Sequence, residues 1–436
     1  MLWKHIASNL ASQENALTSL LSVKQARTIL LDAVHPLEVE QIALRSAHNR
    51  VLGEALDAAY DMPFFTNSSV DGFAVQAGDT AQASLETPVE LVVVADIPAG
   101  SQPVVTIRQG QAARIMTGAP LPQGADAVVM VEATDHYHRD EELPVRKRVR
   151  IHEPVNSGDS IRPRGQDVQA GALLLSAGHA LRPQDLGLLA SQGYATVPVF
   201  RRPKIALLSS GDELLDPSQP ISPGKIYDAN SSMLSALLED CGAEVISAGF
   251  VRDDEDATRS KLDDFSAAGV DLLITSAGVS VGAFDFIRKV ITQNGDLTFW
   301  KVDMRPGKPL AFGRYRGVPV VGLPGNPVSA FVGCLIFVVP MLMKMSGITD
   351  HQPRMLQAKL VEPVESDGRE SYLRAILDEQ DGKAVVRLSG HQGSGNLFAL
   401  TRANALLILP SGVKSLPAGY TVNVFPLMNG KITDYG

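Results

Sequence analysis

Carboxylates recur at three points in the second half of the chain. Asp212 and Glu213 follow a short apolar segment, Asp228 precedes a helical pattern, and Asp285 opens another. Oxygen ligands of this kind suit Mg²⁺, which commonly binds one or two carboxylates together with waters and substrate phosphates. Each carboxylate also has a structural explanation, because Asp228 can cap the following helix and Asp285 can favour a helix N-terminus electrostatically. Both interpretations stay open for each residue.

Groups that suit an anion lie in the same region. Ser276–Gly282 is a small-residue loop before a helical pattern, where backbone N–H groups and the helix dipole can hold an oxyanion. For an isolated glycine loop, a tight strand-to-helix turn is the better explanation. Here the loop is joined by two cations, Arg305 and Lys308, and by a polar Ser329 near the start of an apolar helix. The combination favours a local oxyanion pocket.

The start of that apolar helix has an ordinary explanation of its own. Asn326 as N-cap and Pro327 at the first helical position are common start signals. They do not explain the preceding Pro324–Gly325 turn or the polar Ser329. We therefore expect Ser329 and nearby N–H groups to line the pocket.

A regular alternation of short apolar strands and helices must position these groups. Such an alternation indicates parallel strands with crossover helices, and hence a doubly wound α/β domain. Ligands of such sheets bind beyond the carboxyl ends of the strands. We expect strands at 204–208, 244–250 and 271–275, helices at 230–240, 254–268 and 283–293, and four loops that converge on one edge: Ser209–Glu213, Ser276–Gly282, Met304–Pro309 and Gly322–Ser329.

The rest of the chain has a different texture. Residues 15–54 show a helical face, with a further helix expected before Val51, and residues 57–153 read as a mainly β module. One helix is expected near Pro183. After Gly347, short strands at 355–360, 384–388, 405–409 and 421–425 predict a small β-barrel or sandwich.

Composition limits the function classes. The 436 residues carry 39 Lys and Arg against 48 Asp and Glu, a net charge of −9, which disfavours a nucleic-acid or anionic-membrane binder. The two isolated cysteines, Cys241 and Cys334, favour a reducing cytosol. Residues 317–343 carry no charge, but three prolines and a glycine near their start favour a buried helix over a membrane span.

Three further motifs lie outside the α/β region. Asn67–Phe73 and Arg114–Pro120 are dense turn motifs at strand boundaries, and hairpin chemistry explains both. Arg162 and Arg164 flank a proline and are suited to clamping an anion through bidentate contacts.

Taken in order along the chain, these motifs resemble the molybdopterin molybdenumtransferase family, which includes the gephyrin E domain. The resemblance spans nearly the whole chain and includes Gly393–Gly395 near the C-terminal strands. It rests on Asn67–Phe73, Arg114–Pro120, Ser209–Leu214, Tyr227–Asn230, Ser276–Gly282, Arg305–Pro309 and Gly322–Ser329.

The resemblance implies a multidomain fold of α/β and β parts. The expected divisions are an elongated first domain from residues 1–56 and 154–198, an inserted β-rich domain at 57–153, a doubly wound molybdopterin-binding α/β domain at 199–347, and a C-terminal β-barrel at 348–436. The implied activity is insertion of molybdate into adenylylated molybdopterin, with release of AMP and formation of molybdenum cofactor, using Mg²⁺.

The resemblance also implies partners and a location. Family members are homodimers with the active cleft between subunits. A molybdopterin adenylyltransferase is the candidate substrate donor, and proteins that deliver the cofactor to molybdoenzymes are candidate partners. The expected location is cytoplasmic, without nucleic acid or membrane.

Site residues follow from the same resemblance. Ala277 stands where many relatives have Gly, and Arg305 where some have Lys. Asp228 and Asp285 are the implied metal ligands, and Asp71 and Thr117 are expected to approach the cleft from the second domain of a partner subunit. The implied catalytic residues are Asp71, Thr117, Glu213, Asp228, Asp285, Arg305 and Lys308, and the implied cofactor-binding residues are Ser210, Gly211, Ser276, Gly278, Ser280, Gly282, Pro324, Asn326, Pro327 and Ser329.

Two other functions remain open at this point. A related α/β domain can adenylylate molybdopterin, but that activity does not require the inserted and C-terminal domains. A scaffold without enzymatic activity is the other alternative, because relatives include a scaffold protein. Molybdate-dependent release of AMP distinguishes both from metal insertion.

Overall fold

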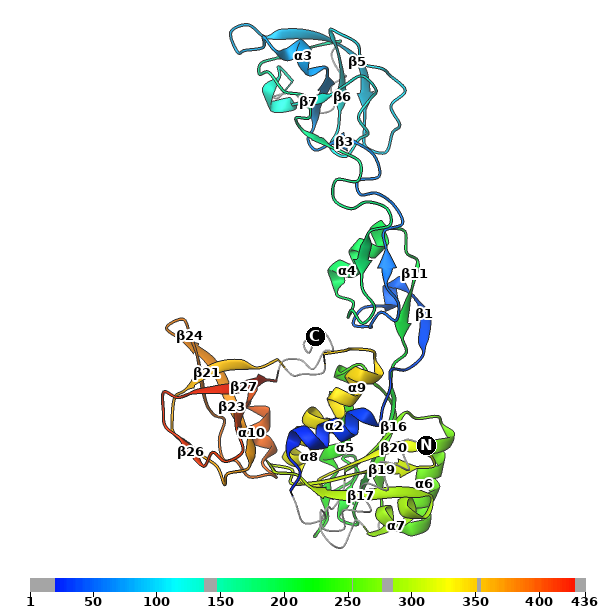
Figure 1. The fold of residues 1–436 in the computed structure, drawn as a ribbon, viewed down its shortest axis with the longest axis vertical. Helices are drawn as coiled ribbons and strands as arrows, with labels where there is room; N and C mark the ends of the chain where they lie inside the picture. Colours follow the sequence, from blue (N-terminus) through cyan, green and yellow to red (C-terminus); the bar gives the residue numbers. More distant parts are fainter. Residues whose placement is uncertain (1–19, 137–146, 253, 277–284, 351–353, 428–436) are drawn as a thin grey trace. The chain divides into compact units, whose positions relative to one another are not determined.

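The chain forms two compact units. The structure, a computed structural model, describes residues 20–136, 147–252, 254–276, 285–350 and 354–427 (Figure 1). Unit 1 runs to Glu54, takes Ala177–Ala190 and resumes at Tyr194, whereas unit 2 consists of Ala55–Ser176 and Ser191–Gly193.

A six-stranded mixed sheet is the centre of unit 1. Its strands are β12 (Lys204–Ser210), β15 (Glu244–Val251), β16 (Leu272–Ser276), β17 (Gly295–Lys301), β19 (Pro309–Tyr315) and β20 (Val318–Leu323). The order is β15-β12-β16-β20-β19-β17. The first four strands are parallel, and β19 runs antiparallel to both of its neighbours.

β19 runs antiparallel to β20 because the connection between the two strands is short. Only Arg316 and Gly317 separate β19 from β20, and both have positive φ, 47° and 87°. A two-residue loop of this kind joins antiparallel strands, whereas parallel strands need a longer crossover. The predicted α/β fold is therefore confirmed, with one reversed strand near its edge.

Helices cover both faces of this sheet (Figure 1). They are α2 (Val23–Asp32), α5 (Ala229–Asp240), α6 (Glu255–Ala267), α7 (Asp285–Gln293), α8 (Pro327–Gly333) and α9 (Val339–Met345). Ile205 and Leu207 of β12 pack with α2, α5, α8 and α9, whereas Ala206 and Leu208 pack with α6 and α7. Strand alternation thus builds two cores from one sheet.

The long apolar segment forms one buried helical run. A π-helical turn, Cys334–Val338 (η3), joins α8 to α9. The run Pro327–Met345 is apolar enough to cross a membrane, but 89% of its most hydrophobic window is buried inside the protein. It is a core helix, as the sequence predicts.

The segment after α2 differs from the sequence prediction. The helix predicted before Val51 is wrong, because residues 39–43 form strand β1 (Val39–Ala43), followed by one short 3₁₀ turn, η1 (Leu44–Ser46). β1 pairs with β11 (Thr196–Phe200), a partner more than 150 residues away in sequence. The spacing of apolar residues within a short segment does not indicate a strand partner so far away in sequence.

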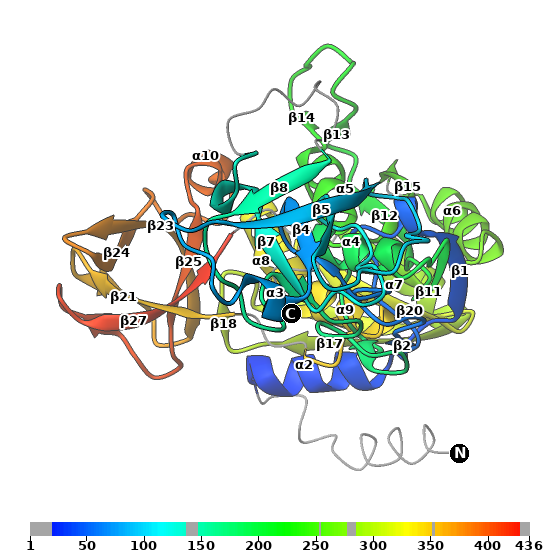
Figure 2. The same cartoon turned by 90° about the horizontal axis from the view of Figure 1, so that it is seen from above.

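A closed β-barrel ends unit 1 (Figure 2). Its five strands are β21 (Leu356–Leu360), β23 (Glu370–Gln380), β24 (Lys383–Leu388), β25 (Ala405–Leu409) and β27 (Thr421–Pro426). Closure arises because β23 pairs with both β24 and β25. Beside it lie α10 (Leu397–Thr401) and the β22 (Val364–Glu365) pairing with β26 (Ser415–Leu416). The predicted barrel is confirmed, although the sequence missed β23.

Unit 2 is built on a five-stranded sheet. Its strands are β4 (Gly72–Val75), β5 (Val89–Ile97), β6 (Gln111–Ile115), β7 (Ala127–Met130) and β8 (Arg148–Ile151), in the order β7-β4-β6-β5-β8. Smaller elements are β2 (Leu56–Asp57) with β10 (Leu173–Leu175), β3 (Asn67–Ser68) with β9 (Ile161–Arg162), α3 (Ala77–Thr80) and η2 (Val131–Ala133).

The helix predicted near Pro183 is α4 (Pro183–Ser191). α2 belongs to the larger core of unit 1, through Val23, Ala26 and Leu30. The four-part domain division stays a prediction.

Candidate functional site

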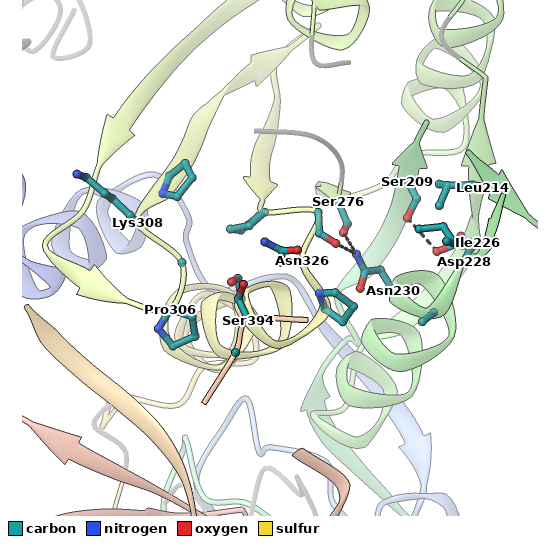
Figure 3. A pocket seen from close by; sticks show the side chains of 18 of the residues that line it. Ser209, Leu214, Ile226, Asp228, Asn230, Ser276, Pro306, Lys308, Asn326 and Ser394 are labelled. Carbon is teal, nitrogen blue, oxygen red and sulfur yellow. Dashed lines mark hydrogen bonds between the residues drawn. The ribbon is translucent and has the colours of Figure 1, made fainter. Parts of the chain in front are cut away.

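A pocket of about 740 Å³ opens at the carboxyl edge of the six-stranded sheet (Figure 3). Residues of three predicted loops line it, together with Ser276 at the end of β16, so the convergence of these parts is confirmed. The lining also includes residues of the short β13–β14 pair and of the barrel: Ser209, Ser210, Glu213, Leu214, Ile226–Asn230, Ser276, Arg305–Pro309, Pro324–Pro327, Ser329, Arg369 and Gln392–Ser394. The volume suits a ligand of nucleotide size.

Asp228 has a structural role at this pocket. It is the N-cap of α5, and its Oδ1 accepts from the Ser231 backbone N–H at 3.0 Å. The hydroxyls of Ser231 and Ser209 also donate to this carboxylate, at 2.5 and 3.4 Å. The side chain is 5% exposed. The capping interpretation is therefore correct, and the carboxylate still faces the pocket with acceptor capacity left.

Asn230 ties two of the loops together. Its Nδ2 donates to Ser276 Oγ and to the Gly325 carbonyl, both at 2.8 Å (Figure 3). Since a carbonyl only accepts, the amide orientation is fixed. Its Oδ1 and the hydroxyl of Ser210 are buried and have no hydrogen-bond partner among the described residues. Buried polar atoms without partners are rare, so these two oxygens await a ligand or water.

The cationic side of the pocket lies on the loop after β17. Met304 and Arg305 form β18, and the Lys308 carbonyl accepts from the Val302 backbone N–H at 2.7 Å. Gly307 has a φ of 95°, and a Cβ there would lie 3.5 Å from the Ser329 carbonyl. Within the described residues, neither Arg305 nor Lys308 forms an ion pair, so both charges remain available to an anion.

The barrel supplies another wall of the pocket. Arg369 reaches it while paired with Asp367, whose pKa is lowered by the Arg369 hydrogen bond and by the charge of Arg305. The Val328 backbone N–H donates to the Ser394 carbonyl at 3.1 Å, which joins the barrel loop to the start of α8.

Arg374 on β23 holds that barrel loop from behind. It is 1% exposed, and its guanidinium donates to the carbonyls of His391, Gln392 and Gly393 at 3.1, 3.3 and 2.9 Å. Burial and the nearby charge of Arg305 lower the pKa of Arg374 to about 10, so it stays protonated at neutral pH. A buried charge bonded to carbonyls alone adds positive potential behind the pocket.

Charge is unevenly distributed around the pocket. Lys308 lies at one end, and Asp228 with Leu214 and Ile226 lies at the other (Figure 3). Cations at one end suit an oxyanion, whereas the Asp228 carboxylate at the other end suits a hard cation or hydroxyl groups.

The predicted site residues divide into four groups, one of which, Asp71 and Thr117, lies in unit 2. Gly211 is next to the pocket but does not line it. Gly278, Ser280 and Gly282 lie outside the described residues, and Asp285 begins α7 with its side chain outside the described part. Ten predicted residues line the pocket: Ser210, Glu213, Asp228, Ser276, Arg305, Lys308, Pro324, Asn326, Pro327 and Ser329.

Asp71 and Thr117 lie together in unit 2. Asp71 Oδ1 accepts from the Thr117 hydroxyl at 2.7 Å and from its backbone N–H at 2.6 Å, and these bonds lower the Asp71 pKa. Next to Asp71, a Cβ on Gly72 would lie 2.0 Å from the Val129 carbonyl, so only glycine fits there. The motif thus fixes an ionised Asp71, and its approach to a cleft stays a prediction.

The anion clamp suggested for Arg162 and Arg164 is not supported. Arg162 pairs with Asp167 at 2.5 Å, and Arg164 pairs with Asp61 at 2.6 Å. Both guanidinium groups are thus already neutralised by carboxylates of unit 2.

Sequence reasoning missed several lining residues. Tyr227 and Asn230 stood within a recognised motif but were not assigned to the site, and their spacing beside Asp228 was the available signal. Arg369 and Gln392 carry no comparable signal, because only the barrel fold brings them to the sheet edge.

Family comparisons cover most of the chain. A family described as "MoeA N-terminal region (domain I and II)" matches residues 21–193. One described as "Probable molybdopterin binding domain" matches 206–344, and "MoeA C-terminal region (domain IV)" matches 357–427.

Individual relatives match over nearly their full length. A "Molybdopterin molybdenumtransferase 2" of Mycobacterium tuberculosis is 38% identical over 416 residues, covering 93% of this chain and 99% of the relative. A "Molybdopterin molybdenumtransferase" of Bacillus subtilis is 37% identical, covering 89% of each chain. The crystal structure of a "molybdopterin biosynthesis moeA protein" from Pyrococcus horikoshii superposes with a TM-score of 0.77 at 30% identity, covering 94% of this chain and 100% of that chain.

Replacing Arg374 tests how the barrel loop is held. Arg374→Met leaves three loop carbonyls without their donor, and we expect a loss of about 3 kcal/mol in the free energy of unfolding. Amide hydrogen exchange at residues 391–394 should become faster. Arg387→Met, an exposed arginine of neighbouring β24, is the matched control and should change neither. Unchanged exchange in the loop of Arg374→Met would contradict this account.

Proposed function

Because the chain belongs to the molybdopterin molybdenumtransferase family, we propose that it inserts molybdate into adenylylated molybdopterin, releases AMP and forms molybdenum cofactor. The observation that carries the proposal is a single pocket with cations at one end, the Asp228 carboxylate at the other, and buried oxygens that no described residue bonds. Such a pocket suits a substrate with a phosphoanhydride together with a second oxyanion.

The cationic end has the chemistry to bind oxyanions. Arg305 and Lys308 have no competing ion pair within the described part of the chain, and Arg374 adds buried positive potential. Charge develops on phosphate oxygens when the bond to AMP breaks, and preorganised donors stabilise that charge without reorganisation. We assign molybdate and phosphate oxygens to this end, with the Ser329 hydroxyl beside molybdate.

The donor atoms at the pocket support including Mg²⁺ in the proposal. Glu213 and Asp228 supply carboxylates at the pocket, and Ser210 Oγ and Asn230 Oδ1 are oxygens there that no described residue bonds. No group of three or more His, Cys, Asp or Glu side chains suited to a metal occurs within the described residues. Two carboxylates suffice where substrate phosphates complete the coordination, so Asp228 and Glu213 are our candidate ligands, with Asp285 retained from the sequence. When bound, Mg²⁺ orients phosphate oxygens and neutralises their charge.

The alternative of adenylylating molybdopterin receives less support. That activity needs only an α/β domain, whereas here the barrel contributes Arg369, Gln392, Gly393 and Ser394 to the pocket. A pocket with a barrel wall favours the reaction of the whole family. A scaffold function alone leaves the unpartnered oxygens and cations without explanation.

Assembly and location are also part of the proposal. We propose a homodimer in which Asp71 and Thr117 of one subunit complete the pocket of the other, with an adenylyltransferase as substrate donor and cofactor-delivery proteins as recipients. A cytoplasmic location is supported by Cys241 and Cys334, which are both buried and are not joined in a disulfide.

The activity itself is tested with purified protein and adenylylated molybdopterin. AMP release should rise on addition of molybdate, and Lys308→Ala should slow it about 100-fold because one charge-stabilising donor is lost. Lys359→Ala, an exposed lysine of the barrel outside the pocket lining, should behave as wild type. Release of AMP that does not respond to molybdate would contradict the proposed function.

Two substitutions at Asp228 separate its capping role from its role at the pocket. Asn caps a helix about as well as Asp, so Asp228→Asn should keep stability, whereas Asp228→Ala should cost about 1 kcal/mol. Both variants should lose turnover and need more Mg²⁺, measured by titrating the metal after chelation. If Asp228→Asn keeps wild-type turnover and the wild-type dependence on Mg²⁺, Asp228 acts only as a helix cap.

Mixing two inactive variants tests whether the site is shared between subunits. In a mixed dimer of Asp71→Asn and Lys308→Ala, a shared cleft produces one intact site and one doubly altered site. Random reassociation should then restore about a quarter of wild-type activity. The control is each variant carried alone through the same dissociation and reassociation. If the mixture stays as inactive as its parents, each site draws both residues from one chain.

A further inference from the structure

Tyr227 is the one aromatic side chain among the described residues that line the pocket. It ends β14 (Ile226–Tyr227), which pairs in parallel with β13 (Leu214–Leu215) (Figure 2). Tyr227 lines the pocket, but the hydrogen bonds and charged groups described above for the site do not involve its aromatic ring.

The ring is held in place from two directions. The Tyr227 hydroxyl donates to the Gln219 carbonyl at 3.0 Å, across the connection between β13 and β14. The next residue, Asp228, is buried, and its backbone N–H donates to the Leu215 carbonyl at 3.0 Å. A side chain anchored at its far end and fixed at its backbone presents its ring without an ordering cost on binding.

The same end of the pocket exposes apolar surface. Tyr227 is 42% exposed and Ile226 is 56% exposed, and Leu214 lines the pocket beside them. Large apolar side chains gathered at a pocket mark a place where a ligand covers them. Leu214 and Ile226 lie at the end of the pocket away from Lys308 (Figure 3). The pocket therefore has an apolar end and a cationic end.

We infer that the ring of Tyr227 forms a platform on which a flat heterocyclic ring of the substrate stacks. The inference rests on the proposed function, which supplies two such rings, adenine and pterin. Stacking at this end leaves the anionic groups of the same substrate directed toward Arg305 and Lys308. The platform thereby sets which way round the substrate enters.

Calorimetric titration with three probes tests the platform. AMP carries the adenine ring, ribose 5-phosphate carries the same sugar and phosphate without it, and free pterin carries the other ring. Loss of one aromatic stacking partner weakens binding of a base about 10-fold. Tyr227→Ala should therefore weaken either AMP or pterin by about this factor, and the probe that weakens identifies the ring. Ribose 5-phosphate should bind as it does to wild type.

Control variants separate stacking from a displaced loop. Tyr227→Phe keeps the ring but loses the bond to Gln219, so it should retain most of the affinity. Tyr420→Ala removes an exposed tyrosine of the barrel outside the pocket lining and should change nothing. The inference is overturned if neither ring-bearing probe is weakened by Tyr227→Ala, or if ribose 5-phosphate is weakened equally.

Failure of this inference is distinguishable from failure of the proposed function. Molybdate-dependent AMP release by the wild-type protein reports on the function, whatever Tyr227 does. If that activity is present and Tyr227→Ala shows no ring-specific loss, only the platform is wrong. If the activity fails, the proposed function is wrong and the platform loses its substrate.

Discussion

The pocket depends on β18, a two-residue strand that follows the six-stranded sheet in the chain but pairs with the barrel. Met304 and Arg305 pair with Glu370 and Ser371 at the start of β23, so the cationic loop of the α/β part is fixed by the barrel. Arg369 strengthens the junction by donating to the Met304 carbonyl at 3.0 Å. The position of Arg305 at the pocket thus follows from backbone pairing of Met304 and Arg305 with residues 370 and 371, 66 residues further along the chain. Without this pairing, the cationic end would be an exposed loop.

The segment at Leu21, near the beginning of the described chain, is hydrogen-bonded to the same junction. The Leu21 backbone N–H donates to the Lys301 carbonyl, and the Asp303 N–H donates to the Leu21 carbonyl, at 2.9 and 2.7 Å. Residues near 21, 303 and 370 therefore meet at one place. Positioning of the cations therefore depends on three segments of unit 1 that are far apart in sequence.

Sequence patterns predict the sheet edge well because the physics there is local. Parallel strands joined by helices align their carboxyl ends, and this alone brings Ser209, Ser276 and Asn326 to one pocket. The barrel wall is different. β23 escaped prediction because polar Ser371 and Arg374 occupy buried positions that a strand pattern reserves for apolar residues. Those buried polar residues are the ones that organise the site.

The role of Asp228 shows a second limit of prediction from sequence. A helix N-cap and a pocket carboxylate both call for Asp at the same place, so residue type cannot separate them. The structure shows that one side chain serves as cap while lining the pocket. Asp71 and Thr117 show the reverse, because the structure gives their mutual hydrogen bonds, whereas their approach to a cleft stays a prediction.

Anomalous diffraction at the molybdenum absorption edge, from crystals grown with molybdate and AMP, tests the central claim most directly. The account predicts a molybdenum peak within contact distance of Arg305, Lys308 or Ser329, with the nucleotide phosphate in the same pocket. A molybdenum peak elsewhere on the protein, with these side chains in contact only with solvent, would contradict it.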